Sequence, residues 1–125
     1  MSRTETTNAA GAFFGLATTP GDPVAPGVTC RTLAAGEQMT FCVFEIAPGA
    51  EVPAHSHPEE QTALVLSGTL DAQVDGEARS LGKWEGYYAP ALVEHGPNRN
   101  NGTEPVLCVD IFSPARGGRA PFASE

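Results

Sequence analysis

The stretch GAEVPAHSHPEEQTALVLSG, residues 49–68, decides the fold and the chemistry that the sequence predicts. It holds His55 and His57, two of the chain's three histidines, one residue apart, and Gln61 follows them. Because side chains alternate between the two faces of an extended segment, both imidazoles project to the same side. Pro58 predicts a turn, after which Gln61 on the next strand can meet them. The stretch therefore predicts a point where two imidazoles and an amide converge.

The remaining histidine, His95, lies in another strand-like segment, beyond Pro90. A further donor from a distant strand is what completes a metal site that neighbouring ligands begin. The histidine pair alone leaves a second interpretation open, in which both are surface residues flanking a turn. The wider sequence decides between the two.

Short apolar segments separated by Gly, Pro or Asn run along most of the chain, which has 14 Gly and 11 Pro. Few stretches show a period of helical length, and Asp75-Gly76 predicts a tight hairpin turn. Evenly spaced short strands predict an all-β barrel or jelly roll. The expected strands are 28–33, 38–49, 52–57, 61–68, 70–81, 86–90, 93–98 and 105–114.

The length of 125 residues suits one domain. We expect an N-terminal arm over 1–26, a barrel over 27–114 and a flexible C-terminal tail over 115–125, in which Phe122 can dock on the barrel. The arm reads either as mobile or as a lid strand around Phe13, Phe14 and Leu16.

Charge and cysteine content exclude several classes of partner and site. With 15 acidic and 7 basic residues the net charge is −8, which repels nucleic acid and anionic membrane surfaces, so neither is an expected partner. The 3 cysteines form no CXXC pair, and buried reduced thiols are expected. No signal peptide or membrane span is recognisable, which makes the cytoplasm the expected location.

The wider pattern resembles the cupin family, whose first motif is GX5HXHX3EX6G and whose second ends in PXGX2HX3N. The first motif is matched at every spacing by Gly49, His55, His57, the position of Gln61, and Gly68. Pro90 and His95 match the second motif, and the resemblance covers about residues 28 to 113. Two departures stand out. Gln61 replaces the usual Glu, and the second motif has Leu92 at its glycine and Arg99 at its asparagine, with Asn98 one residue earlier.

The resemblance implies a double-stranded β-helix, or jelly roll, that holds one divalent metal ion per chain. It implies His55, His57, Gln61 and His95 as ligands, and Zn, Fe, Ni or Mn as the metal. The chain also looks like small cupins that carry Gln at this position, including uronate-tautomerising proteins and aromatic polyketide cyclases. Both of these groups perform non-redox enol chemistry.

Gln61 changes the charge of the predicted site. Glutamate would bring a negative charge and a general base, whereas glutamine offers only a neutral carbonyl oxygen. The metal then keeps its full positive charge and is a stronger Lewis acid toward a carbonyl, carboxylate or enol. The alternative is that Gln61 does not bind, which leaves a three-histidine site with open positions.

Three functions follow. The favoured one is a metal-dependent isomerase, cyclase or lyase that acts on a small carbonyl-containing or enolisable substrate. The second is a mononuclear iron dioxygenase, and the third is a non-catalytic module that binds a small molecule. Tyr87 and Glu59 are the candidates for a catalytic proton donor or acceptor, because both lie near the ligands in sequence. A homodimer is expected, with the apolar arm residues AFFGL crossing to a partner barrel.

Overall fold

The computed structural model describes residues 11–117, and within this range every regular element apart from one 3-10 turn, η1 (Leu16–Thr18), is a β-strand. The all-β prediction is confirmed. The strands are β1 (Asp22–Ala25), β2 (Val28–Ala35), β3 (Thr40–Ile46), β4 (Glu51–Val52), β5 (Glu60–Ser67), β6 (Leu70–Val74), β7 (Glu77–Leu81), β8 (Gly86–Ala89), β9 (Asn98–Arg99) and β10 (Val106–Ser113).

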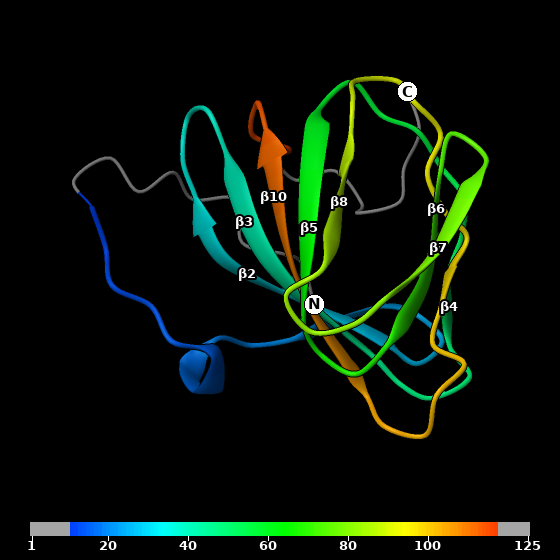
Figure 1. The fold of residues 1–125 in the computed structure, drawn as a ribbon. Coiled ribbons are helices and arrows are strands. Elements are labelled where there is room, and N and C mark those ends of the chain that lie inside the picture. Colours follow the sequence, from blue (N-terminus) through cyan, green and yellow to red (C-terminus); the bar gives the residue numbers. More distant parts are fainter. Residues whose placement is uncertain (1–10, 118–125) are drawn as a thin grey trace.

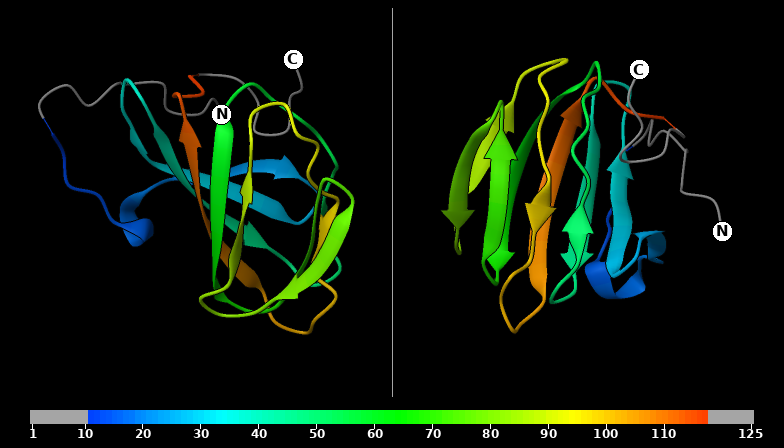
Figure 2. Two further views of the ribbon diagram at one scale, coloured as in Figure 1. Left: turned by 45° about the horizontal axis from the view of Figure 1, so that its top comes forward. Right: turned by 90° about the vertical axis from the view of Figure 1, so that its right-hand side faces the viewer.

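The strands build two antiparallel sheets that face each other. A six-stranded sheet has the order β1-β2-β3-β10-β5-β8, and a four-stranded sheet has the order β4-β9-β6-β7. Figures 1 and 2 show the larger sheet as a curved wall and the β6–β7 hairpin with β4 as the opposite wall. This is the jelly-roll arrangement that the strand spacing predicts.

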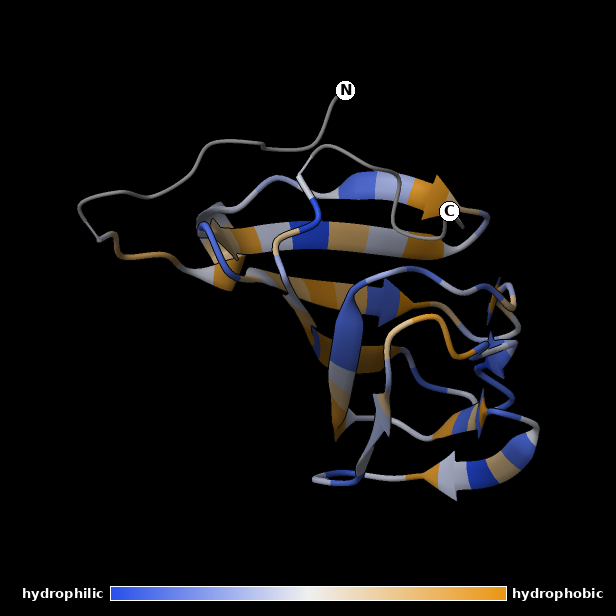
Figure 3. Cartoon of the chain, turned by 90° about the horizontal axis from the view of Figure 1, so that it is seen from above, coloured by the Kyte–Doolittle hydropathy of each residue, from blue (hydrophilic) through white to orange (hydrophobic). Residues whose placement is uncertain are grey.

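Alternation along the strands decides which side chains enter the space between the sheets. In β5, Gln61, Ala63 and Val65 are buried and their neighbours are not, as expected for residues that share the inner face. In β10, Val106, Cys108, Asp110 and Phe112 alternate in the same way. Figure 3 shows the resulting bands of apolar and polar residues. The inner face of β10 is apolar except for Asp110, and it packs against β3 and β5 at the centre of the larger sheet.

The two segments that carry the histidines are less regular than predicted. Strands were expected over 52–57 and 93–98, but only β4 and β9 form, at the edges of these segments. His55 and His95 instead pair as an isolated bridge, each donating its backbone N–H to the other's carbonyl over 2.9 Å. His95 makes a second isolated bridge, to Val74. The prolines at 53, 58, 90 and 97 cannot donate to a ladder, which explains why no continuous ladder forms here.

Two turns follow from local sequence. Asp75 and Gly76 both have positive φ, 51° and 80°, and close the β6–β7 hairpin at the predicted position. Leu92 has a φ of 67°. It occupies the place of the glycine in the second motif, so this loop keeps the left-handed conformation that favours glycine although a leucine supplies it.

The packed region extends beyond both expected boundaries of the barrel. Residues 22–25 of the expected arm form β1, which pairs with β2. At the other end Arg116 is 3% exposed and donates its backbone N–H to Thr40 Oγ1 over 2.9 Å. Residues 1–10 and 118–125, which include Phe122, lie outside the described range.

The cysteines and the helix content bear on two further expectations. Cys30, Cys42 and Cys108 are buried and form no disulfide, as predicted. Within residues 11–117, no helix is long and apolar enough to cross a membrane.

Candidate metal centre

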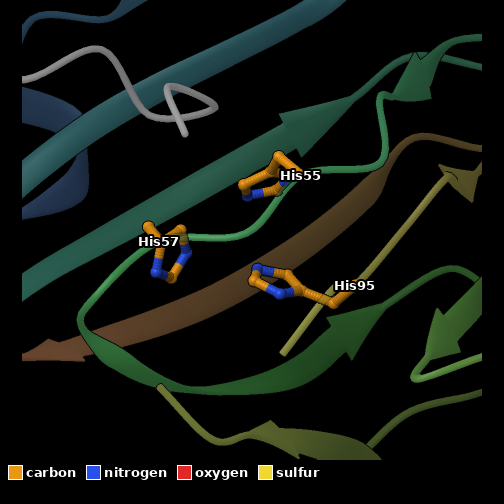
Figure 4. A group of neighbouring side chains, drawn as sticks. All are labelled: His55, His57 and His95. Carbon is orange, nitrogen blue, oxygen red and sulfur yellow. The ribbon is translucent and has the colours of Figure 1, made fainter. Parts of the chain in front are cut away.

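Three histidines from two loops meet inside the barrel. His55, His57 and His95 are 7%, 1% and 1% exposed, and each offers a ring nitrogen within 4.8 Å of the others. Figure 4 shows the three imidazole rings turned toward one common point between the strands. The predicted convergence of the histidine pair with His95 is therefore confirmed, and the interpretation of surface histidines beside a turn is wrong.

The backbone fixes which nitrogen of each ring faces the centre. The Nδ1 atoms lie 2.9 to 3.0 Å from the carbonyl oxygens of Pro53, Glu59 and Val93, respectively. A carbonyl only accepts hydrogen bonds, so each Nδ1 carries the proton. In a neutral imidazole, Nε2 is then unprotonated and carries a lone pair. This is the tautomer, and the kind of outer support, that histidines bound to a metal have.

Gln61 adds an oxygen to the same point. Its Oε1 lies 3.0 Å from Nε2 of His57 and 3.0 Å from Nε2 of His95. Its amide nitrogen points the other way, donating to Asp110 Oδ2 over 2.5 Å and to the Tyr87 hydroxyl over 3.4 Å. The predicted meeting of Gln61 with the histidines is confirmed, and the residue faces them from β5, the strand after the Pro58 turn, as expected.

The four atoms that face this point, three histidine nitrogens and the Gln61 oxygen, fit a divalent cation. Each histidine carries its proton on Nδ1, so its Nε2 is a hydrogen-bond acceptor, and the Gln61 amide oxygen is an acceptor as well. No hydrogen bond can therefore join these atoms. Acceptors at 3.0 Å without a hydrogen between them repel each other unless a positive charge lies among them. Imidazole nitrogens with one neutral oxygen suit Zn, Fe, Ni and Mn, and the geometry does not select among these metals.

Burial keeps His55 and His95 neutral. It lowers the pKa of His55 to about 4 and lowers the pKa of His95 as well, because a charged ring is poorly solvated there. Repulsion between the neighbouring rings acts in the same direction. Both rings are therefore in the neutral form, which is the form that binds a metal, at neutral pH.

A small cavity lies beside the histidines, on the side of Gln61. The space open to the centre of a water molecule is only about 20 Å³, which is room for about one water. Its polar lining consists of His55, Gln61, Tyr87, Asn98, Cys108 and Asp110. Tyr87, a predicted catalytic candidate, thus faces the site. The other candidate, Glu59, is not among the residues that line this cavity.

Glu59 instead lies next to the His57 ring, on the side that faces away from Gln61. It is 5% exposed, whereas acids after a turn proline are usually solvated. Its Oε1 lies 3.4 Å from Nδ1 of His57, the nitrogen that faces away from Gln61, and 4.0 Å from the guanidinium of Arg116. That guanidinium also lies over the ring of Phe112 at 5.0 Å.

Sequence reasoning missed two buried polar residues of the cavity wall. Asp110 is 4% exposed, and burial raises the pKa of its carboxyl to about 7. Asn98 donates its side-chain N–H to the Tyr87 hydroxyl over 3.2 Å. A usable signal existed for Asp110, because it is the one charged residue on the otherwise apolar inner face of β10.

Comparison with known protein families gives the identity of the fold. The Cupin_2 model, described as a cupin domain, matches residues 42–112. The chain belongs to the cupin family. The matched region holds all three histidines, Gln61 and Asp110.

Individual relatives of this cupin share parts of its sequence and its fold. A Bacillus subtilis protein named H2HPP isomerase is 37% identical over 67 residues, which are 53% of this chain and 28% of that protein. The match therefore spans less than a third of the relative's length.

Solved structures match more of the chain. KdgF from Halomonas sp. has a TM-score of 0.80 and 26% identity and covers 86% of this chain and 96% of its own. An RmlC-like cupin from Shewanella frigidimarina has a TM-score of 0.75 and 23% identity over 93% of this chain and 96% of its own. The polyketide cyclase RemF from Streptomyces resistomycificus has a TM-score of 0.73 and 19% identity over 91% and 87%, which shows a shared fold.

Proposed function

We propose that this cupin is a metal-dependent isomerase, cyclase or lyase that performs non-redox chemistry on a small substrate with a carbonyl or enolisable group. The observation that carries the proposal is the neutral donor set. Three histidine nitrogens and the Gln61 oxygen face one point, and within residues 11–117 no carboxylate oxygen joins them.

His55, His57, Gln61 and His95 would hold one divalent ion. Because none of these ligands is charged, the ion would keep its full charge and act as a Lewis acid, polarising a substrate carbonyl and stabilising the enolate formed next to it. The chain's part is to hold these ligands in fixed orientations, which the three backbone carbonyls and the contacts of Gln61 do.

Tyr87 is suited to donate a hydrogen bond to a substrate oxygen. Its hydroxyl accepts N–H groups from Asn98 and Gln61, so both lone pairs have partners and its own hydrogen remains for a third group. Burial raises its pKa well above the usual value, so it stays protonated. Tyr87 therefore acts as a donor or general acid, and not as a base.

The size of the cavity limits the substrate. Room for about one water beside the histidines admits only the reacting end of a molecule. Tyr87 also lines a larger groove of about 450 Å³ between β8 and the β6–β7 hairpin, whose walls include Ala72, Leu81 and Val93. Asp75, Glu77 and Arg79 also line this groove, so a substrate would place its reacting end at the histidines and a larger part of mixed polarity in the groove.

The comparisons support this reaction class. The Bacillus subtilis relative, 37% identical over 67 residues, is named an isomerase. Neutral histidine ligands also suit ferrous iron, which makes a mononuclear dioxygenase the second candidate. A non-catalytic binding module is the third.

The experiment that separates these functions uses chelator-stripped protein reloaded with Zn²⁺, Ni²⁺, Mn²⁺ or Fe²⁺. Exchange of α-protons for deuterium is followed by NMR on a panel of small keto acids and β-dicarbonyl compounds, and oxygen uptake is measured for the ferrous form. We expect metal-dependent exchange without oxygen uptake, and its loss in His57→Ala. Oxygen uptake with product formation would instead establish the dioxygenase, and inactivity of every form would leave the binding module.

Tyr87→Phe tests the proposed donor. It removes one hydroxyl and keeps the ring in place, so metal content should stay close to wild type, while stability should fall by about 1–3 kcal/mol because the buried Asn98 N–H loses its acceptor. We expect the exchange rate to fall by about 10²-fold, a typical loss for one positioned acid or hydrogen-bond donor. An unchanged rate in fully metal-loaded Tyr87→Phe would remove Tyr87 from the mechanism.

A further inference from the structure

The orientation of one amide decides whether the site presents an oxygen to a metal. A glutamine side chain has an oxygen at one end and an NH₂ group at the other. In this structure the oxygen of Gln61 faces Nε2 of His57 and of His95 at 3.0 Å. The opposite orientation would turn the NH₂ group toward these nitrogens.

That opposite orientation would satisfy the histidines without any metal. The two NH₂ hydrogens would meet the two Nε2 lone pairs, and the site would close on itself with hydrogen bonds. It would also leave only the histidine nitrogens for a cation. Something outside the ligand set must therefore hold the amide in the orientation that favours metal binding.

Asp110 is the group placed to do so. It lies on the inner face of β10, where its neighbours in register are Ala63 of β5 and Cys42 of β3. Its Oδ2 accepts the amide N–H of Gln61 over 2.5 Å, the shortest polar contact that Gln61 makes among the described residues. The Tyr87 hydroxyl is a weaker constraint, because it is 3.4 Å away and can either donate or accept.

In this structure Oδ2 of Asp110 faces the Gln61 amide nitrogen and accepts its hydrogen. Turning the amide over would lose this hydrogen bond and bring the amide oxygen against the carboxyl oxygen, so Asp110 opposes the closed, metal-free orientation. Asparagine at the same place would not oppose it, because it offers an acceptor at one end and a donor at the other.

We propose that Asp110 is a positioning residue, which holds the Gln61 amide with its oxygen toward His57 and His95 and so prepares the site for a metal ion. This inference rests on the proposed function only in requiring that the histidines bind a metal. It concerns metal affinity and not the reaction.

The test measures Zn²⁺ affinity of chelator-stripped protein by calorimetric titration against a competing chelator. Asp110→Asn should bind Zn²⁺ about 10- to 100-fold more weakly than wild type, the usual loss when an outer partner of a metal ligand is removed. The metal-free variant should be at least as stable as the metal-free wild type in urea unfolding, because its amide can adopt the closed orientation. A merely structural role would lower stability and affinity together.

A second test introduces Asp110→Asn into protein that already carries Gln61→Glu. A carboxyl group has oxygens at both ends, so it presents an oxygen whichever way it turns. Asp110→Asn should therefore cost little Zn²⁺ affinity when combined with Gln61→Glu, although it costs much alone. Asp22→Asn is the matched control, because Asp22 is also buried, 8% exposed, but lies in β1 at the opposite edge of the larger sheet from β8.

The outcomes separate the two proposals. Equal loss of affinity from Asp110→Asn in both backgrounds, or no loss in either, would overturn the positioning role while the metal site stands. Failure of wild-type protein to bind Zn²⁺ and the other divalent ions would overturn both. Loss of affinity in Asp22→Asn equal to that in Asp110→Asn would show a general effect of burial and also overturn the inference.

Discussion

His55 illustrates how one buried residue couples stability to pH. Burial lowers its folded-state pKa from 6.5 to about 4. Above pH 6.5 the ring is neutral in the folded and the unfolded chain, and protons do not affect the balance. Between pH 6.5 and 4 the unfolded chain takes up a proton that the folded chain refuses, so stability falls as pH falls. The difference between the two pKa values corresponds to a loss of about 3 kcal/mol in the free energy of unfolding once the pH has fallen from 6.5 to 4.

The prediction concerns the metal-free protein. We expect the free energy of unfolding of wild type, relative to that of His55→Asn, to fall by about 3 kcal/mol from pH 6.5 to 4. Wild type must be compared with this variant because Asp110 has the opposite effect on stability. Its folded-state pKa is raised from 3.8 to about 7, so the folded protein loses stability as the pH rises through this range. Urea unfolding at several pH values in the presence of a chelator measures both proteins. A difference independent of pH would contradict the buried, neutral His55.

At the scale of elements, the pairing of β8 with β5 places Tyr87 over the site. Tyr87 is in register with Ala63, and Gly86 is in register with Leu64. A Cβ atom on Gly86 would come within 1.9 Å of the Ala63 carbonyl oxygen, a contact with backbone that a side-chain rotation cannot relieve. β8 lies at the edge of the larger sheet, so the strand itself would have to move.

Gly86→Ala should therefore destabilise the fold by at least about 1–3 kcal/mol, the usual cost of overpacking, and displace Tyr87. Urea unfolding measures the first effect, and loss of the Tyr87-dependent activity measures the second. Gly82→Ala is the control, because a Cβ there meets only the end of the Glu85 side chain, at 3.7 Å. Equal stability of the two variants would show that β8 is not held against β5 as described.

The strands and their pairing show which parts of the fold and the site could be predicted from the sequence. Alternation and spacing were enough to bring His55, His57, Gln61 and His95 together, because these residues sit in two short segments with a strong local pattern. Strands could be located, but apart from the hairpin at Asp75 and Gly76 they could not be paired, so nothing in the sequence placed Asp110 of β10 next to Gln61 of β5. Asn98 and Arg116 were missed for the same reason, since each contacts residues distant in the chain.

Irregular backbone was the other limit. The segments around His55 and His95 look like strands because they alternate, yet their prolines reduce the pairing of the histidines to isolated bridges. The first strand, β1, was missed because DPVA carries no alternation and is held only by pairing with β2. In the first case prolines interrupt the alternating pattern, and in the second the pairing with β2 makes a strand of a segment that has no such pattern.

At the scale of the whole molecule, apolar side chains of the arm lack a cover. Phe13 is fully exposed, and Phe14, whose ring packs edge-on against Phe41, is 51% exposed. We propose that the chain forms a homodimer in which this arm packs on the partner barrel. Light scattering should give twice the chain mass of 13.0 kDa, and Phe13→Ser should weaken the dimer.

Trp84→Ser serves as the control for the dimer, because Trp84 is also exposed, at 68%, but lies in the turn between β7 and β8. It should leave the mass unchanged. A monomeric wild type at high concentration would contradict the proposal and return the arm to the role of a lid.

The central claim is that the three histidines and Gln61 form one metal site, and metal content tests it most directly. Tag-free wild type, His57→Ala and the surface control Arg79→Ala, purified without chelators, would be compared by elemental analysis. We expect one divalent ion per chain in wild type and in Arg79→Ala, and almost none in His57→Ala. Protein without metal, which also fails to take up zinc, nickel, manganese or ferrous iron when these are supplied, would contradict it.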